Sequence, residues 1–175
     1  MSSSQSLLRR IRVLLFLFIC ALILSGITAI PLETELGVLA KIIGVAEKSA
    51  TTQSAGLIGW VAKVHAGLVE TNAQYSFFAY GTDWLAFAHF VIAIAFIGPM
   101  RDPVRNIWVV EFGMIACVLV VPFAFGMGAV RGIPLGWRLI DCSFGVFGII
   151  PLWFCQRQIK ELAQLIAPTP DHQAK

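Results

Sequence analysis

Long apolar stretches alternate with short polar segments along this chain. Four of them carry few charged residues, and they cover 13–30, 84–100, 107–130 and 139–156. An α-helix rises about 1.5 Å per residue, so about 20 apolar residues cross the roughly 30 Å of hydrocarbon in a bilayer. The pattern therefore predicts an all-α, polytopic protein whose four transmembrane helices pack as a bundle.

The segment 31–83, between the first two stretches, has a different pattern. Its apolar residues recur every three or four positions, with charged residues between them. This spacing is typical of amphipathic helices that lie in the membrane interface or cover a bundle. We expect two such helices, joined near residues 49–56, in the first outer loop. They either shield that loop or form a lid over a ligand site.

The composition agrees with a membrane protein. Hydrophobic residues make up 58% of the chain and charged residues 13%, against about 25% charged residues in soluble proteins, and the mean hydropathy is +0.81. The spans and the loop segment occupy most of the 175 residues. The sequence thus predicts one membrane domain over 1–175 with a cytoplasmic tail at 157–175. A net charge of +3 gives no reason to expect a nucleic-acid partner.

Basic residues indicate the orientation of the predicted helices. If the spans alternate in direction, three groups of basic residues fall on the same side of the membrane. The first group is Arg9, Arg10 and Arg12, the second is Arg101 and Arg105, and the third is Arg157 and Lys160. Cytoplasmic flanks collect such residues, so both termini are expected in the cytoplasm and the protein in a cell inner membrane. Four tryptophans at predicted span ends agree with interfacial anchoring, and they are Trp84, Trp108, Trp137 and Trp153.

The first span also has the features of a cleaved signal peptide. A basic region at 9–12 precedes it, and Ile27, Thr28 and Ala29 form a tolerable cleavage site. Its apolar run of about 18 residues is longer than the usual signal-peptide core of about 7–15 residues. We therefore expect the first span to be retained.

Ionisable residues within spans are the main functional signal, because each costs about 2.5–3.5 kcal/mol at a helix centre. The candidate ligand-binding cluster at the outer side is Asp83, His89, Arg131, Arg138 and Asp141. One interpretation is structural, with Asp141 paired to Arg138 or to His89 so that helix register is fixed. The other is a pocket in which the arginines hold an anionic headgroup or substrate and His89 exchanges a proton near neutral pH.

A second polar group lies near the cytoplasmic end of the third span. It consists of Arg101, Asp102, Arg105 and Glu111. We expect a salt bridge from Glu111 to Arg101 or Arg105, and we interpret the whole group as structural.

Small residues predict where the helices approach closely, because close backbone contact supplies much of the packing between apolar helices. The candidates are Gly145 and Gly148 in the fourth span, Gly113 and Cys117 in the third, and Ala86, Ala93 and Ala95 in the second.

Motifs of known chemistry do not occur in the sequence. It lacks metalloprotease, phosphate-loop and serine-hydrolase patterns, and its four cysteines have no Cys-x-x-Cys spacing. We expect neither a metal nor a cofactor, assign no catalytic residue and recognise no characterised family. The function we favour is a non-enzymatic accessory or assembly subunit that contacts a membrane-protein partner or a second copy of itself. The alternative is a membrane-embedded binder, carrier or enzyme for an anionic lipid or other amphiphile at the outer cluster.

Overall fold

A computed structural model describes residues 3–44 and 56–167 of the chain. Among these residues every regular element is a helix. Four helical runs are long and apolar enough to cross a membrane, and they are Ser3–Ala29, Gly56–Arg101, Ile107–Val130 and Leu135–Ile166. The prediction of an all-α protein with four helices of this kind is confirmed.

The first half of the chain forms a long helix and several shorter ones. Helix α1 (Ser3–Ala29) includes the predicted first span and the basic residues before it, and α2 (Leu32–Ile42) follows. The second long run is made of α3 (Gly56–Tyr75), the 3-10 helix η1 (Ser76–Ala79), α4 (Tyr80–Ala95) and α5 (Ile97–Arg101). Of the predicted joint at 49–56, residues 49–55 lie outside the described part of the chain.

The second half consists of two long helices. Helix α6 (Ile107–Val130) has the bounds of the predicted third span. Helix α7 (Leu135–Ile166) includes the predicted fourth span and continues into the predicted tail. The end of that tail, 168–175, lies outside the described residues.

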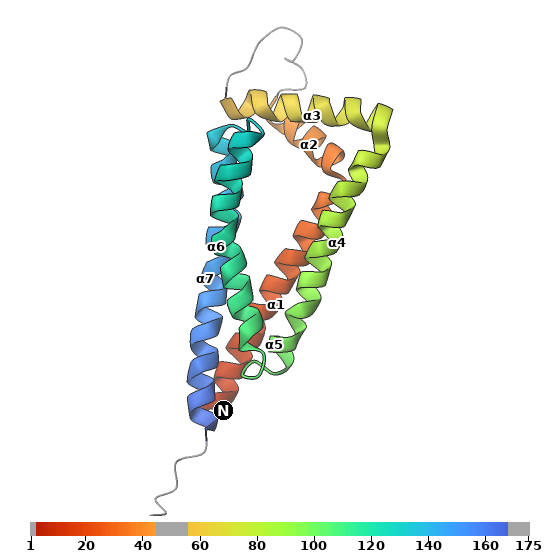
Figure 1. Ribbon diagram of the computed structural model, residues 1–175. Helices are drawn as coiled ribbons and strands as arrows, with labels where there is room; N and C mark the ends of the chain where they lie inside the picture. The colour runs from red at the N-terminus through yellow and green to blue at the C-terminus, as the bar shows by residue number, and fades with distance from the viewer. Residues whose placement is uncertain (1–2, 45–55, 168–175) are drawn as a thin grey trace, which may run out of the picture.

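The long helices pack mainly as two pairs, α6 with α7 and α1 with α4. Figure 1 shows that the pairs converge where α1 begins, α5 lies and α7 ends, which we call the N-terminal end. At the opposite end, which we call the loop end, the pairs stand apart, and α3 lies across them with α2 beside it (Figure 1). The arrangement is therefore closed at one end by helix packing and bridged at the other by α3.

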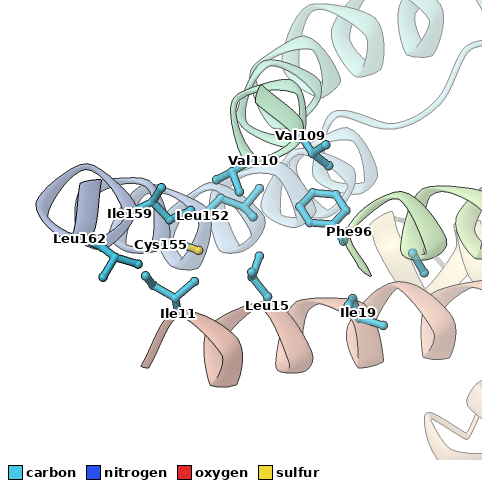
Figure 2. Packing of buried hydrophobic residues seen from close by; sticks show 11 residues of the cluster. Ile11, Leu15, Ile19, Phe96, Val109, Val110, Leu152, Cys155, Ile159 and Leu162 are labelled. Carbon is cyan, nitrogen blue, oxygen red and sulfur yellow. The ribbon is translucent and has the colours of Figure 1, made fainter. Parts of the chain in front are cut away.

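The larger buried core lies at the N-terminal end (Figure 2). It joins α1, α6, α7 and the α4–α5 junction, and its most buried members are Ile11, Leu15, Phe96, Val110, Leu152, Cys155 and Ile159. The rings of Phe96 and Phe18 lie 4.8 Å apart, measured between centroids. Apolar side chains gain little by leaving lipid, so this core stabilises the contact chiefly through close packing.

A smaller core lies at the loop end. Leu36 and Ala40 of α2 are buried with Val61 of α3, and Trp137 at the start of α7 packs against them. The Asn72 side-chain amide also donates a 2.6 Å hydrogen bond to Glu33, which links α3 to α2. Trp137 therefore contributes to a helix contact, unlike the exposed Trp84, Trp108 and Trp153.

Small residues form the helix contacts where the sequence predicts them. A Cβ added at Gly145 would collide with the backbone carbonyl of Cys117, and one at Gly148 would lie 2.9 Å from the Cys117 sulfur. These glycines therefore allow α6 and α7 to approach closely. The prediction is also confirmed at Gly113, which faces the Phe96 ring, and at the buried Ala86 and Ala93, but it is wrong for Ala95, which is exposed.

Candidate functional site

The five residues predicted as an outer cluster all lie toward the loop end, but on different helices. Asp83 is exposed in the first turn of α4, and Arg131 is exposed just after α6. Helix α4 begins on one side of the molecule, whereas α6 ends and α7 begins on the other (Figure 1). The structure therefore does not gather Asp83 and Arg131 into one site. The other three residues, His89, Arg138 and Asp141, are half-buried.

Arg138 is held by the turn between α6 and α7. Its Nε donates a 2.7 Å hydrogen bond to the carbonyl oxygen of Ile133, and its side chain lies against Gly128, where an added Cβ would be 2.8 Å from the Arg138 Cδ. The Ile133 carbonyl precedes Pro134, at the start of α7, and among the described residues no backbone N–H from a turn or cap donates to it. The alternative in which Arg138 pairs with Asp141 is not realised among the described residues.

His89 is oriented by its own helix. Its Nδ1 lies 2.7 Å from the carbonyl oxygen of Leu85, one turn earlier in α4. Because a carbonyl oxygen can only accept, Nδ1 must carry the proton, and this leaves Nε2 as the nitrogen that can accept a hydrogen bond or take up a second proton. The second structural alternative, a bond between His89 and Asp141, is likewise absent from the described residues.

Helix periodicity shows which way His89 and Asp141 face. Residues seven apart lie on nearly the same helix face, about 10 Å apart along the axis. His89 precedes Phe96 by seven residues, and Asp141 precedes Gly148 by seven. Phe96 contacts Gly113 of α6 as well as Phe18 of α1, and a Cβ at Gly148 of α7 would lie 3.8 Å from the Phe18 ring, so both residues contact the opposite helix pair. His89 and Asp141 therefore face the interior between the helix pairs, about two turns from this contact layer toward the loop end.

Ser25 belongs to the same level but was not anticipated from the sequence. It follows Phe18 by seven residues on α1, which runs in the opposite direction to α4, so helix periodicity places it about two turns toward the loop end on the same face as Phe18, where it is exposed. A serine in an apolar helix is a weak signal by itself. Ser25 could be found only from its seven-residue spacing from Phe18. That spacing indicates the face on which Ser25 lies only when the contact between Phe18 and Phe96 is known.

The level that carries Ser25, His89 and Asp141 lies between the two buried cores. The larger core extends over the N-terminal end, and the smaller one involves α2, α3 and Trp137. Among the described residues no buried hydrophobic cluster joins α1 and α4 to α6 and α7 between them. Helix periodicity thus places three polar residues, the exposed Ser25 and the half-buried His89 and Asp141, at the level where packing between the helix pairs is least extensive. They can offer a hydroxyl, an imidazole nitrogen and a carboxyl to a group that enters from outside the chain.

The second polar group, near the N-terminal end, is built differently from the prediction. Asp102 accepts a 3.1 Å hydrogen bond from the backbone N–H of Arg105. Asn106, which the sequence did not single out, donates to the carbonyl oxygens of Asp102 at 2.9 Å and Gly98 at 3.3 Å. These bonds shape the turn between α5 and α6, while the side chains of Arg101 and Arg105 are exposed.

Glu111 does not join that turn. It accepts a 3.0 Å hydrogen bond from the side-chain amide of Gln156, so it links α6 to α7. The predicted salt bridge to Arg101 or Arg105 is therefore wrong, because helix pairing turns Glu111 toward a neutral donor on α7. Gln156 was missed because it is 45 residues away in sequence.

No group of three or more His, Cys, Asp or Glu side chains that could hold a metal ion is found within 3–44 and 56–167. The four cysteines are free thiols, with Cys142 and Cys155 buried, Cys117 half-buried and Cys20 exposed.

Comparisons of the chain with protein-family models, with curated proteins and with solved structures find no significant match.

Proposed function

We propose that this chain is a small multi-pass protein of a bacterial-type inner membrane, in which the four long helices form a transmembrane bundle with both termini in the cytoplasm. Basic residues support this orientation. Three groups of them lie on α1, near α5 and on the last part of α7, and those segments meet at the N-terminal end (Figure 1). Cytoplasmic flanks are enriched in Lys and Arg. On this orientation α2 and α3 are amphipathic helices at the outer face.

Within that membrane, we propose a non-enzymatic accessory or assembly subunit that receives a transmembrane helix of a partner protein between its two helix pairs. The supporting observation is the inward-facing level of Ser25, His89 and Asp141, which lies between the two cores. A carboxyl or imidazole inside a membrane is costly unless it finds a polar partner. Polar side chains that bond across helices are a common means of joining membrane subunits.

Site-specific photo-crosslinking in the native cell tests this proposal. A photoreactive residue in place of Ser25 is expected to crosslink to one membrane protein. The same residue in place of Leu24, which is 62% exposed and lies on the opposite side of α1 from Leu15 of the core, provides the control. Asp141→Asn should reduce the Ser25 crosslink severalfold, and Asp83→Asn should leave it unchanged. Equal crosslinking from both positions, or no effect of Asp141→Asn, contradicts the proposal.

A second candidate function is binding of a lipid or another amphiphile at the same level. The observation that favours it is the Nε2 of His89, which has no hydrogen-bond partner within the described part of the chain, while Nδ1 is bonded to the Leu85 carbonyl. Here the crosslink from Ser25 yields a lipid-sized adduct instead of a protein. Native mass spectrometry of the purified wild-type chain is then expected to retain an adduct that is lost in Asp141→Asn and kept in Asp83→Asn.

A further inference from the structure

A shallow groove lies at the N-terminal end, away from the inward-facing level described above. It has a volume of about 870 Å³ and runs between the first half of α1 and α5. Its basic lining residues are Arg9 and Arg12 of α1 and Arg101 of α5. Among the described residues that line it, none is acidic. Three cationic side chains thus surround one groove without a lining carboxylate to offset them.

Arg12 is fixed in this groove by a specific contact. Its Nε donates a 3.3 Å hydrogen bond to the carbonyl oxygen of Met100, the residue before Arg101. This bond uses one of the five N–H donors of the guanidinium and leaves the terminal nitrogens to act on another acceptor. The bond also ties α1 to α5, so that the cations of the two helices are held at the same level.

The groove becomes apolar in the direction of the membrane centre. Val13 and Phe16 line it on α1, one turn and more beyond Arg9 and toward the middle of the helix. Their side chains are 51% and 57% exposed, respectively. The site therefore combines a cationic end with an apolar wall, and it is open to one side.

We propose that this groove binds an anionic phospholipid of the adjacent leaflet. Its phosphate would lie among the three arginines, and an acyl chain would lie along Val13 and Phe16. Guanidinium groups bind phosphate oxygens through charge-assisted, often bidentate hydrogen bonds. A basic residue near an anionic membrane surface contributes about 1 kcal/mol of attraction. A free phosphate ion matches the arginines alone, whereas a phospholipid matches both parts of the groove.

Two double variants of equal charge test the proposal. Arg9→Gln with Arg101→Gln removes two lining cations. The matched control, Arg10→Gln with Arg105→Gln, removes two exposed cations that do not line the groove, from α1 and from the turn after α5. Full-length protein in detergent is titrated with phosphatidylglycerol, with phosphatidylcholine and with inorganic phosphate. Native mass spectrometry and the thermal unfolding midpoint report binding.

We expect phosphatidylglycerol to bind and stabilise the wild type more than phosphatidylcholine does. The Arg9/Arg101 variant should bind it roughly tenfold more weakly, while the Arg10/Arg105 variant stays within about twofold of wild type. Equal losses in both variants would overturn the site in favour of diffuse attraction. If inorganic phosphate stabilised the protein as much as phosphatidylglycerol does, the groove would be a site for small anions and not for a lipid. If phosphatidylglycerol and phosphatidylcholine bound equally well, the charge of the headgroup would have no role in binding.

A further measurement on the wild type does not depend on the folding of any variant. Phosphatidylglycerol with a photoreactive group in its acyl chain is expected to crosslink within 13–16. Crosslinks spread evenly over other lipid-facing positions, such as the 70% exposed Phe123 of α6, would contradict a defined site.

Discussion

Gly145 contributes to the contact between α6 and α7 because it has no side chain. The atom nearest to a Cβ built there is the backbone carbonyl oxygen of Cys117. A flexible side chain could rotate away from an added methyl group, but a backbone atom can move only if its helix moves. Substitution at Gly145 should therefore separate two helices, even though alanine is the better helix former.

Gly145→Ala is expected to lower the free energy of unfolding by about 1–3 kcal/mol, as overpacking in a close contact does. Gly126→Ala is the matched control, because no atom outside its own helix backbone and chain neighbours lies within 4 Å of a Cβ at Gly126 of α6. This control should be neutral or stabilising by up to about 1 kcal/mol. Reversible denaturation in mixed micelles measures both values. Equal effects at the two glycines would contradict the contact.

At the scale of helices, α6 and α7 are also joined by the hydrogen bond between Glu111 and Gln156. The sequence identified Glu111 as a costly charge but assigned it to nearby arginines. Its actual partner follows from the register of α6 against α7, which Gly145 and Gly148 set through Cys117. The apolar pattern predicts which segments are helices. The apolar pattern does not indicate how two helices are shifted along each other, so it could not predict that Glu111 pairs with Gln156.

A double-mutant cycle with Glu111→Ala and Gln156→Ala tests the bond between the helices. We expect a coupling free energy of about 0.6 kcal/mol and no more than about 1.7 kcal/mol, which are the mean and the maximum found for side-chain hydrogen bonds between membrane helices. Glu111→Gln should keep most of the stability, because its amide carbonyl can still accept from Gln156. A coupling near zero, measured by denaturation in micelles, would mean that the two side chains act independently.

At the scale of the whole molecule, the sequence predicted the helices better than their arrangement. The four apolar stretches correspond to four long helical runs. The convergence of the helix pairs at one end depends on Phe96, which packs against Phe18 and Gly113 from distant helices. His89 and Asp141 were recognised because charge in an apolar stretch is visible locally. Their shared inward face depends on tertiary contacts, whereas the hydrogen bond from Arg138 to Ile133 is local to the turn before α7.

When the chain is produced in excess over the proposed partner, so that no partner helix lies between the helix pairs, their separation at the loop end (Figure 1) predicts that water reaches the level of Ser25 and Asp141. Ser25→Cys, in a variant whose four native cysteines are replaced by alanine, should react with a water-soluble maleimide, because the thiolate that reacts forms in water. Leu24→Cys in the same background is the control, since Leu24 is 62% exposed on the outward face and would lie in lipid. We expect labelling roughly tenfold faster at 25 than at 24, because ionisation of a thiol is suppressed in apolar surroundings. Equal labelling rates at positions 25 and 24 would contradict the access of water to this level. Comparing intact spheroplasts with inverted vesicles also reports the side from which the maleimide arrives, and faster labelling of residue 25 in spheroplasts supports a cytoplasmic N-terminus.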